Sequence, residues 1–526
     1  MAKKFNITGT CIPGTHYMAD TSAKIAKIIP LIREREYFTI NRPRQYGKTT
    51  TLFLLEQELK KDSSNLVIDI SFEGIDEPTY SEQKRFIPTF LNLVKKSLAF
   101  NREKEAMELI DTYGSIRDFN HLSNFITAFV EKAQRRVILL IDEVDKSSNN
   151  RLFLDFLGML RTKYLKRSEG KDYTFHSVIL AGIHDVKTLK SLIRDDEEKK
   201  FNSPWNIAAE FNIDLSLFPG EIIPMLEDYS REKKIKVEPN VFAEQIFHYT
   251  SGYPFLVSKL CKIIDEEILP AKHVLEWNLE DLDRAIQLVL KENNTNFESL
   301  VKNLENNPEL YELVFKLVMN EMQFSFNLLN PVIALGVLYG ILKEDRGKAR
   351  IHNRIYEQLI YNYMTSSLET SGVINLSKYD TGGSYLEENG GLNMEKVIRR
   401  FQQFMIEQYS TKDIEFIERN GRLLFLAFIR PVINGRGFDF KEVQVSEEKR
   451  IDIVVTFGNK KYIIELKLWR GEAYHREGIR QLCGYLDQQR ETTGYLLIYD
   501  LRKESGQTGK WETIETEGKK IHAAWV

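Results

Sequence analysis

The sequence predicts an α/β protein made of a doubly wound parallel sheet, a helical middle region and a second α/β domain. Three observations carry this prediction: a Gly-Lys-Thr loop between an apolar strand and a helix, an apolar strand that ends in two carboxylates, and a later strand pair bearing Asp and Glu-x-Lys. Strands that alternate with helices favour a parallel sheet covered on both faces.

A phosphate-binding loop is predicted at residues 42–49, directly after the strand segment 37–40. The general pattern is G-x-x-x-x-G-K-[ST] between a strand and a helix. Arg42 stands at the first glycine position of this pattern. The residues expected to surround a nucleotide here are Arg42, Pro43, Arg44, Gln45, Tyr46, Gly47, Lys48, Thr49 and Thr50.

Each residue that matches the pattern has a chemical role in binding the nucleotide. Gly47 lets backbone N–H groups crowd onto a phosphate at a helix N-terminus. Lys48 supplies a charge for the terminal phosphates, and the Thr49 hydroxyl is a ligand for Mg²⁺. A surface turn with a chance Gly-Lys-Thr is the alternative, and the flanking strand and helix argue against it.

The partner motif is the apolar run 137–141 followed by Asp142 and Glu143. Five apolar residues without alternation predict a strand buried on both faces. Asp142 is expected to hold Mg²⁺, directly or through water, and Glu143 to polarise the attacking water. Asp145 and Lys146 follow in the same loop. Together the two motifs predict ATP or GTP hydrolysis, with ATP as the expected nucleotide.

Composition limits the remaining possibilities. The chain has 526 residues, 42% hydrophobic and 28% charged, which predicts about three or four soluble domains. The net charge of −3 gives no overall attraction to nucleic acid, so such contacts require local patches. Three distant cysteines indicate a reducing compartment and no metal cluster. The longest apolar stretch is too short to span a bilayer. A cytoplasmic protein is expected.

Two more strands are predicted at residues 65–72 and 176–182. The second leads into His184 and Asp185, where related ATPases place a residue that senses the terminal phosphate. An ordinary turn at the strand end is an equally good interpretation of these two residues.

Residues 219–290 have helical periodicity throughout. Within them, Gly252-Tyr253-Pro254 opens a helix with an apolar stripe. This feature resembles the lid of signal-transduction ATPases, in which such a turn packs on the nucleotide base, so Pro254 is a candidate nucleotide contact. A helix that starts with proline in its first turn explains the same residues.

Helices and a basic hairpin at residues 341–351 suggest a winged-helix module within residues 293–370. Such modules contact protein as often as DNA. Residues 371–392 are rich in Gly, Ser and Asn and are expected to form a linker.

A second constellation lies beyond the linker. Asp452 is in the strand segment 450–455, and Glu465 and Lys467 share one face of the segment 461–468. Hairpin pairing would place Asp452 beside Glu465, two carboxylates suited to Mg²⁺ or Mn²⁺, with Lys467 near the reacting phosphate. The opposite face of this strand is apolar, so the strand is expected to be covered on both sides. Because unpaired buried charges are costly, a buried metal site is favoured over a pair of charges exposed at the surface. Gln481 follows on a predicted helix, four residues before Tyr485 and on the same side.

The order D, E-x-K, Q-x-x-x-Y over residues 393–526 resembles the PD-(D/E)XK nuclease superfamily, in the variant fused to AAA-type ATPases. This resemblance implies a metal at Asp452 and Glu465, and catalysis by Lys467 and Gln481. It also suggests Glu418 as a further acidic residue near the metal. Ile451 stands where the superfamily's name-giving proline is expected.

The N-terminal two-thirds resembles the AAA-like ATPases that accompany such nucleases. The resemblance rests on residues 16–21, 41–50, 202–207 and 251–254. In it, Arg42 at the first glycine position is usual. It also implies a homo-oligomer in which a neighbouring subunit supplies an arginine, and Arg194 is the candidate.

The expected domains are therefore a P-loop ATPase core at 1–215, a helical lid at 216–292, a winged-helix-like module at 293–370, a linker at 371–392 and a nuclease-like domain at 393–526. The expected function is an ATP-controlled, metal-dependent nuclease acting on nucleic acid, with DNA favoured and a bacterial defence role suggested by the resemblance. The alternatives are a nucleotide-switched regulatory ATPase whose C-terminal domain binds without cutting, and an ATPase of a mobile element.

Overall fold

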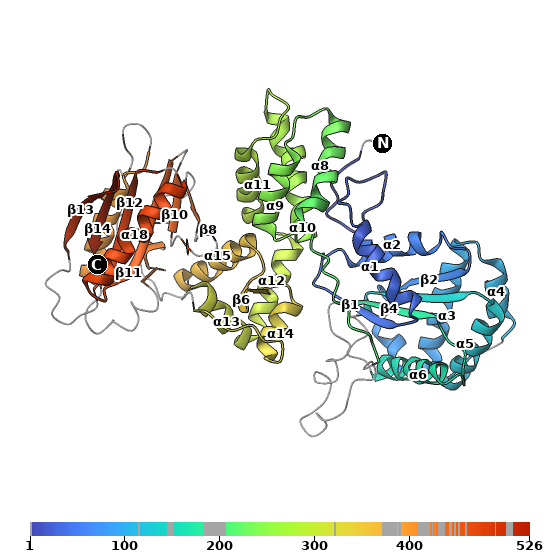
Figure 1. Ribbon diagram of the computed structural model, residues 1–526. Coiled ribbons are helices and arrows are strands. Elements are labelled where there is room, and N and C mark those ends of the chain that lie inside the picture. The colour runs from blue at the N-terminus through green and yellow to red at the C-terminus, as the bar shows by residue number, and fades with distance from the viewer. Residues whose placement is uncertain are drawn as a thin grey trace, which may run out of the picture. The chain divides into compact units, whose positions relative to one another are not determined.

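A computed structural model describes most of the chain. The described residues are 3–113, 116–144, 151–182, 207–319, 322–370, 385, 387, 391–408, 421–422, 424–426, 428–429, 437–440, 444–446, 449–450, 453–457, 460–489, 491–500 and 509–526. The chain forms two compact units, and Figure 1 labels many of their helices and strands. The first comprises residues 1–310 with 325–355, and the second comprises 311–324 with 356–526.

The first unit is built on a four-stranded sheet with the order β1-β4-β3-β2. Its strands are β1 (Tyr37–Asn41), β2 (Asn65–Ser71), β3 (Arg136–Asp142) and β4 (Ser177–Gly182). All three pairings are parallel. The four strands predicted from the sequence are confirmed, and so is the parallel α/β class. The sheet places the carboxyl ends of β1 and β3 at the same edge, where α/β sheets bind their ligands.

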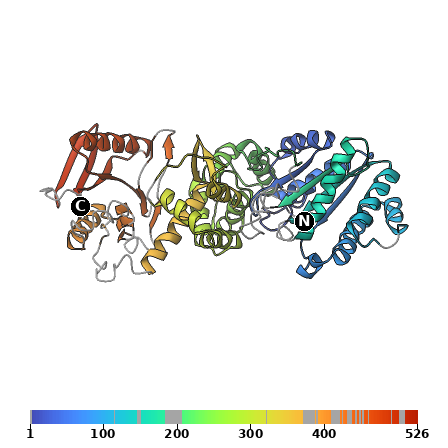
Figure 2. The same cartoon turned by 90° about the horizontal axis from the view of Figure 1, so that it is seen from below.

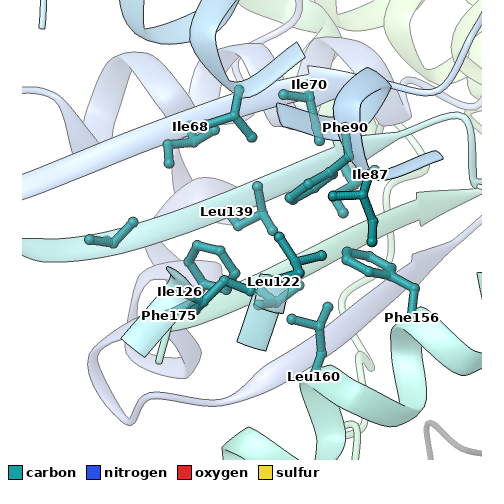
Figure 3. Close-up of a cluster of buried hydrophobic side chains, with 14 of the residues drawn as sticks. Ile68, Ile70, Ile87, Phe90, Leu122, Ile126, Leu139, Phe156, Leu160 and Phe175 are labelled. Atoms are coloured by element: carbon teal, nitrogen blue, oxygen red, sulfur yellow. The ribbon is translucent and has the colours of Figure 1, made fainter. Parts of the chain in front are cut away.

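Helices cover both faces of this sheet. They are α1 (Ser22–Arg33), α2 (Lys48–Leu59), α3 (Gln83–Phe100), α4 (Lys104–Asp111), α5 (Phe119–Ala133) and α6 (Arg151–Ser168), with a 3-10 turn at Glu77–Ser81. One face packs on α3, α5 and α6, as the side chains of Ile68, Leu139, Phe90, Leu122 and Phe156 show (Figure 3). Because successive residues of a strand point to opposite faces, the buried Val67, Ile138 and Ile179 turn to the other face.

The segment that leads to the next helices lies along the open edge of β1. The backbone N–H of Ala209 donates to the carbonyl of Tyr37 at 2.8 Å, and Ala209 bridges Phe38 in parallel. The phenyl ring of Phe211 stacks on that of Phe38, with centroids 5.8 Å apart. This segment is therefore held beside the strand that precedes the Gly-Lys-Thr loop.

The helical region that follows contains α8 (Pro219–Lys233), α9 (Pro239–Thr250), α10 (Pro254–Ile263) and α11 (Leu279–Lys291), with short turns at Ile264–Ile268 and Leu269–Ala271. It confirms the predicted all-helical stretch. Gly252, just before α10, has φ +71°, and a Cβ atom there would lie 2.4 Å from the carbonyl oxygen of Leu217. Only glycine fits both the backbone conformation and this close approach.

Further helices and the predicted hairpin follow. They are α12 (Thr295–Glu305), α13 (Pro308–Val318), α14 (Pro331–Leu338), β5 (Leu342–Asp345), β6 (Lys348–Ile351) and α15 (Arg354–Thr370). The strands β5 and β6 pair antiparallel around Arg346 (φ 51°) and Gly347 (φ 75°). Two consecutive left-handed residues make the tight turn that matches the twist of a hairpin.

The second unit contains a six-stranded mixed sheet with the order β13-β14-β12-β11-β10-β7. Its strands are β7 (Gly437–Phe440), β10 (Ile453–Phe457), β11 (Lys460–Leu468), β12 (Thr493–Tyr499), β13 (Trp511–Thr516) and β14 (Lys519–Trp525). A separate pair is formed by β8 (Gln444–Ser446) and β9 (Lys449–Arg450). Helix α18 (Glu472–Gln489) covers one face, and α16 (Met394–Gln408) lies on the other (Figure 2).

Among the described residues, no helix is long and apolar enough to cross a membrane. Most of the predicted linker, 371–392, falls outside the described residues, and the finer domain division made from the sequence stays a prediction.

Candidate functional site

The Gly-Lys-Thr loop lies between the end of β1 and the start of α2. Gly47 is the residue before α2 and has φ 80°, and Gln45 has φ 55°. These left-handed residues turn the chain sharply, so that the backbone N–H groups at the start of α2 face the end of the sheet. A Cβ atom on Gly47 would lie 3.8 Å from Pro254 Cγ. The structure therefore places Pro254 against the loop.

Lys48 is buried, with 7% of its surface exposed. Its ammonium group donates to the carbonyl oxygens of Arg42 and Pro43, each at 3.0 Å. These contacts fold the lysine side chain back over the loop, where a bound phosphate would meet its charge. Thr49 is exposed at the start of α2, and its hydroxyl donates to Asp142 Oδ2 at 2.7 Å.

Asp142 ends β3 and brings the second motif to the loop. One carboxylate oxygen accepts from Thr49, and the other accepts from the backbone N–H of Glu143 at 2.9 Å. Glu143 has φ 55°, an uncommon conformation for a residue with a side chain. Such backbone strain is often found at functional sites. The two motifs predicted to act together are thus joined by a direct hydrogen bond.

A cavity of about 740 Å³ surrounds these residues. Its lining includes Lys48, Thr49, Asp142, Glu143 and Pro254, and also the N-terminal segment 6–11. The backbone N–H of Cys11 in that segment donates to the Thr50 hydroxyl at 3.0 Å. No local sequence pattern marks this segment as a wall of the site, because only tertiary structure brings it to α2.

Asp69 on β2 is a second lining residue that the sequence reasoning missed. Burial raises the pKa of its carboxyl to about 7, and the nearby Glu56 and Asp142 add to the increase. The sequence signal for Asp69 is an acidic residue inside the otherwise apolar run of β2.

The loop is also fastened from outside the sheet. The hydroxyl of Tyr253 donates to the carbonyl of Arg44 at 2.6 Å. The hydroxyl of Tyr46 lies 2.6 Å from Ser216 Oγ and 3.0 Å from His352 Nε2. Burial lowers the pKa of His352 to about 3, so its imidazole is neutral and able to accept from Tyr46. Residues far apart in sequence therefore fix the loop.

A larger cavity of about 1030 Å³ lies elsewhere in this unit, lined by residues such as His16, Arg33, Asp62 and His176. It contains no residue of the Gly-Lys-Thr loop. The smaller cavity, with its lysine, hydroxyl and carboxylates, is the one with nucleotide chemistry.

In the second unit, Glu465 and Lys467 lie on β11 as predicted. Glu465 is buried, with 2% exposure, and Lys467 Nζ lies 2.8 Å from its Oε1. Strand β10 pairs antiparallel with β11, and Ile453 is opposite Ile464. Lys467 turns toward α18, because a Cβ on Gly478 would lie 3.4 Å from Lys467 Cγ. The shared face of Glu465 and Lys467 is confirmed.

Helix α18 carries Gln481 and Tyr485, so the predicted helix at these residues is also confirmed. Tyr485 is buried in the core between α18 and the sheet, and Gln481 is partly exposed. Tyr485 is thus a packing residue, whereas Gln481 is accessible.

Several residues named from the sequence lie outside the described residues. They are Asp145, Lys146, His184, Asp185, Arg194, Glu418 and Asp452. The structure brings together the N-terminal motifs, and it brings Glu465 to Lys467. The described residues contain no group of three His, Cys, Asp or Glu side chains placed to hold a metal.

A strand, a Gly-Lys-Thr loop and a helix, with the threonine bonded to the aspartate of a nearby parallel strand, define a P-loop nucleotide-binding protein. The AAA-like domain family matches residues 17–362. The chain belongs to this family, and it contains an ATPase domain of the AAA-like type.

The chain is similar to several proteins at low sequence identity. An uncharacterized WD repeat-containing protein of Synechocystis, slr0143, is 20% identical over 365 residues, and the match covers 65% of this chain and 29% of that protein. The chain thus spans less than a third of this relative's length. The Walker-type ATPase paby2304 of Pyrococcus abyssi is 10% identical, with a TM-score of 0.46, covering 68% of this chain and 99% of that one. The ORC2 protein of Aeropyrum pernix is 12% identical, with a TM-score of 0.37, over 66% and 93% of the two chains.

Proposed function

We propose that the cavity around the loop binds ATP with Mg²⁺ and hydrolyses it. The observation that carries this proposal is the hydrogen bond between Thr49 Oγ1 and Asp142 Oδ2, at 2.7 Å. It sets a hydroxyl and a carboxylate side by side, and these oxygen donors fit Mg²⁺ and its water ligands. When bound, Mg²⁺ would neutralise charge on the terminal phosphates.

The other roles follow from position. The N–H groups at the start of α2 accommodate phosphate oxygens, and Lys48 adds its positive charge. Glu143 lines the same cavity, one residue beyond Asp142, and its carboxylate would accept a proton from the attacking water. Pro254 and residues of the segment 6–11 line the same cavity and are candidates to contact the base.

Two variants test these roles. Lys48→Ala should weaken ATP binding, measured by calorimetry, because the lysine acts on the bound ground state. Glu143→Gln should bind ATP as the wild type does and hydrolyse it at least about a hundredfold more slowly, because the glutamate acts on the water in the transition state. Wild-type hydrolysis rates in both variants would exclude this site.

We further propose that the second unit is a metal-dependent nuclease controlled by the ATPase. This proposal rests on the buried Glu465, which is paired with Lys467 on β11. Strand β11 has a neighbouring strand on each side. Burying a carboxylate is costly unless a cation accompanies it. The register that pairs Ile453 with Ile464 is the one on which the predicted Asp452–Glu465 pair depends.

In this proposal Glu465 and Asp452 would hold Mg²⁺ or Mn²⁺, which would activate water and stabilise charge on the phosphodiester. Lys467, paired with Glu465, would approach the reacting phosphate. Gln481, on the helix that packs on this face, would orient substrate or water. If the ion pair of Glu465 and Lys467 only stabilised the sheet, its geometry would be the same. The protein would then be the alternative, a regulatory ATPase whose C-terminal domain binds without cutting.

The decisive experiment is a cleavage assay on plasmid, linear duplex, single-stranded DNA and RNA, with Mg²⁺ or Mn²⁺ and with or without ATP. Cleavage should require metal and disappear in Asp452→Ala. Lys461→Ala is the matched control, because Lys461 is an exposed lysine on the same strand that contacts Gln489. No cleavage of any substrate would favour the regulatory ATPase, and cleavage by Asp452→Ala at the wild-type rate would indicate a contaminating nuclease.

From the sequence resemblance we also propose that the substrate is DNA and that the protein serves in defence. The same resemblance suggests a homo-oligomer in which Arg194 reaches a neighbouring site. An Arg194→Ala variant that hydrolyses ATP normally would remove Arg194 from that role.

A further inference from the structure

Arg42 occupies the position where the general phosphate-loop pattern has its first glycine. The backbone explains why glycine is unnecessary there. Within the loop, positive φ angles occur at Gln45 and Gly47 and not at Arg42. An arginine therefore fits without strain, and its side chain is available for contacts that glycine cannot make.

The Arg42 side chain turns away from the cavity toward the segment along β1. Its Nη2 donates to the carbonyl of Ile213 at 2.6 Å, and its Nη1 donates to the carbonyl of Asn41 at 2.8 Å. The guanidinium lies 5.5 Å from the centre of the Phe211 ring. Arg42 is absent from the lining of the nucleotide cavity, so its charge is not aimed at the phosphates.

The backbone of the same residue faces the site. The carbonyl oxygen of Arg42 accepts from Lys48 Nζ at 3.0 Å. One residue thus fixes its side chain to residues 211–213 and presents its carbonyl to the phosphate-binding lysine. The direction of the lysine ammonium depends on where this carbonyl stands.

The same segment holds the loop a second time. Ser216 lies three residues beyond Ile213, and its hydroxyl is 2.6 Å from that of Tyr46. Its backbone N–H is anchored on Asp214 Oδ1 at 2.8 Å. Residues 213–216 therefore support the loop at two positions, Arg42 and Tyr46.

We propose that Arg42 is a positioning residue of the ATPase, which holds the start of the loop against residues 211–213 and thereby orients Lys48. This proposal rests on the proposed ATP binding. It makes an unusual prediction: restoring the general pattern with glycine should impair the site. If the Arg42 side chain only covered apolar surface, its replacement would lower the stability of the protein and leave the nucleotide affinity unchanged.

The test compares ATP affinity by calorimetry, with thermal unfolding measured in parallel. Arg42→Gly and Arg42→Met should each raise the Kd for ATP about tenfold, the usual effect of losing a hydrogen bond made by a charged group. Arg42→Met keeps the apolar stem over Phe211, so it remains informative if the glycine variant folds poorly. Arg85→Met, an exposed arginine on α3, is the control and should bind like the wild type.

A double variant shows whether Arg42 acts through Lys48. In a Lys48→Ala background, Arg42→Met should produce no further loss of ATP affinity. Additive losses would mean that Arg42 acts on the nucleotide by itself. Wild-type affinity in both Arg42 variants would overturn the proposal, whereas a wild-type protein that binds no ATP would instead overturn the proposed function.

Discussion

Lys163 is a buried cation whose ammonium group is held by three oxygen atoms. Its Nζ donates to Asp172 Oδ2 at 2.8 Å, Thr127 Oγ1 at 2.6 Å and the Ser123 carbonyl at 3.0 Å. Lys163→Met should lower the free energy of unfolding by about 3 kcal/mol, because it leaves the largely buried Asp172 without its cation. Urea unfolding followed by circular dichroism measures the loss.

Lys171→Met is the matched control, because Lys171 pairs with Glu169 at the surface, where both side chains are more than half exposed. Its removal should change stability little. If the two variants unfold at the same urea concentration, the buried ion pair of Lys163 and Asp172 contributes no more to stability than the exposed pair of Lys171 and Glu169.

His352 makes stability depend on pH. Burial lowers the pKa of its imidazole to about 3, and Lys343 acts in the same direction. A folded pKa below the unfolded value of about 6.5 means that the stabilisation is complete above that pH and is lost as the pH falls toward 3. Between pH 7 and pH 5 the wild type should lose about 2 kcal/mol through this residue.

His352→Gln keeps an acceptor for Tyr46 and does not titrate, so its unfolding free energy should fall less over the same range. The two pH profiles are subtracted from each other, because other groups also titrate in this range. Asp69, whose pKa is raised to about 7, contributes stability that is lost as the pH rises from 4 to 7, which is opposite to the effect of His352. Parallel pH profiles for the two proteins would show that His352 is not held neutral.

At the scale of elements, the turn before α10 sets the position of Tyr253 and Pro254 against the loop. Gly252→Ala would force a Cβ onto the Leu217 carbonyl in a left-handed conformation. A loss of about 2 kcal/mol or more is expected, together with a higher KM for ATP. Gly158→Ala in α6 is the opposite control, because its Cβ would meet nothing within 4 Å. It should stabilise by about 0.5 to 1 kcal/mol. Equal stability of the two variants would contradict the close approach at Gly252.

The elements that could be predicted from sequence are those with a strong local pattern. β3 was predictable because five apolar residues precede Asp142, and the hairpin because its polar tip contains Arg346 and Gly347. The order β1-β4-β3-β2 was not, since no local pattern records which strands become neighbours. The contacts of Tyr46 with Ser216 and His352 were missed for the same reason: they join three segments through tertiary packing alone.

At the scale of the whole molecule, the proposed function assigns two chemistries to separate residues of one chain. Lys467→Met should reduce metal-dependent cleavage at least about a hundredfold, because it removes the cation beside the reacting phosphate. Its ATP hydrolysis should stay within about twofold of the wild type, as Lys467 is not part of the P-loop site. Steady-state rates of both reactions, measured on one preparation, test this directly. Loss of both activities would mean that Lys467 supports the fold instead.

The three cysteines of the chain differ in accessibility, which has a practical consequence. Cys261 and Cys483 are buried, whereas Cys11 is partly exposed on the wall of the nucleotide cavity. Burial raises the pKa of the Cys11 thiol, so a maleimide dye should attach slowly and faster at alkaline pH. The native chain therefore offers a single attachment point for a fluorescent probe beside its phosphate loop. Nucleotide occupancy could be followed optically, and ATP should protect this thiol from the dye.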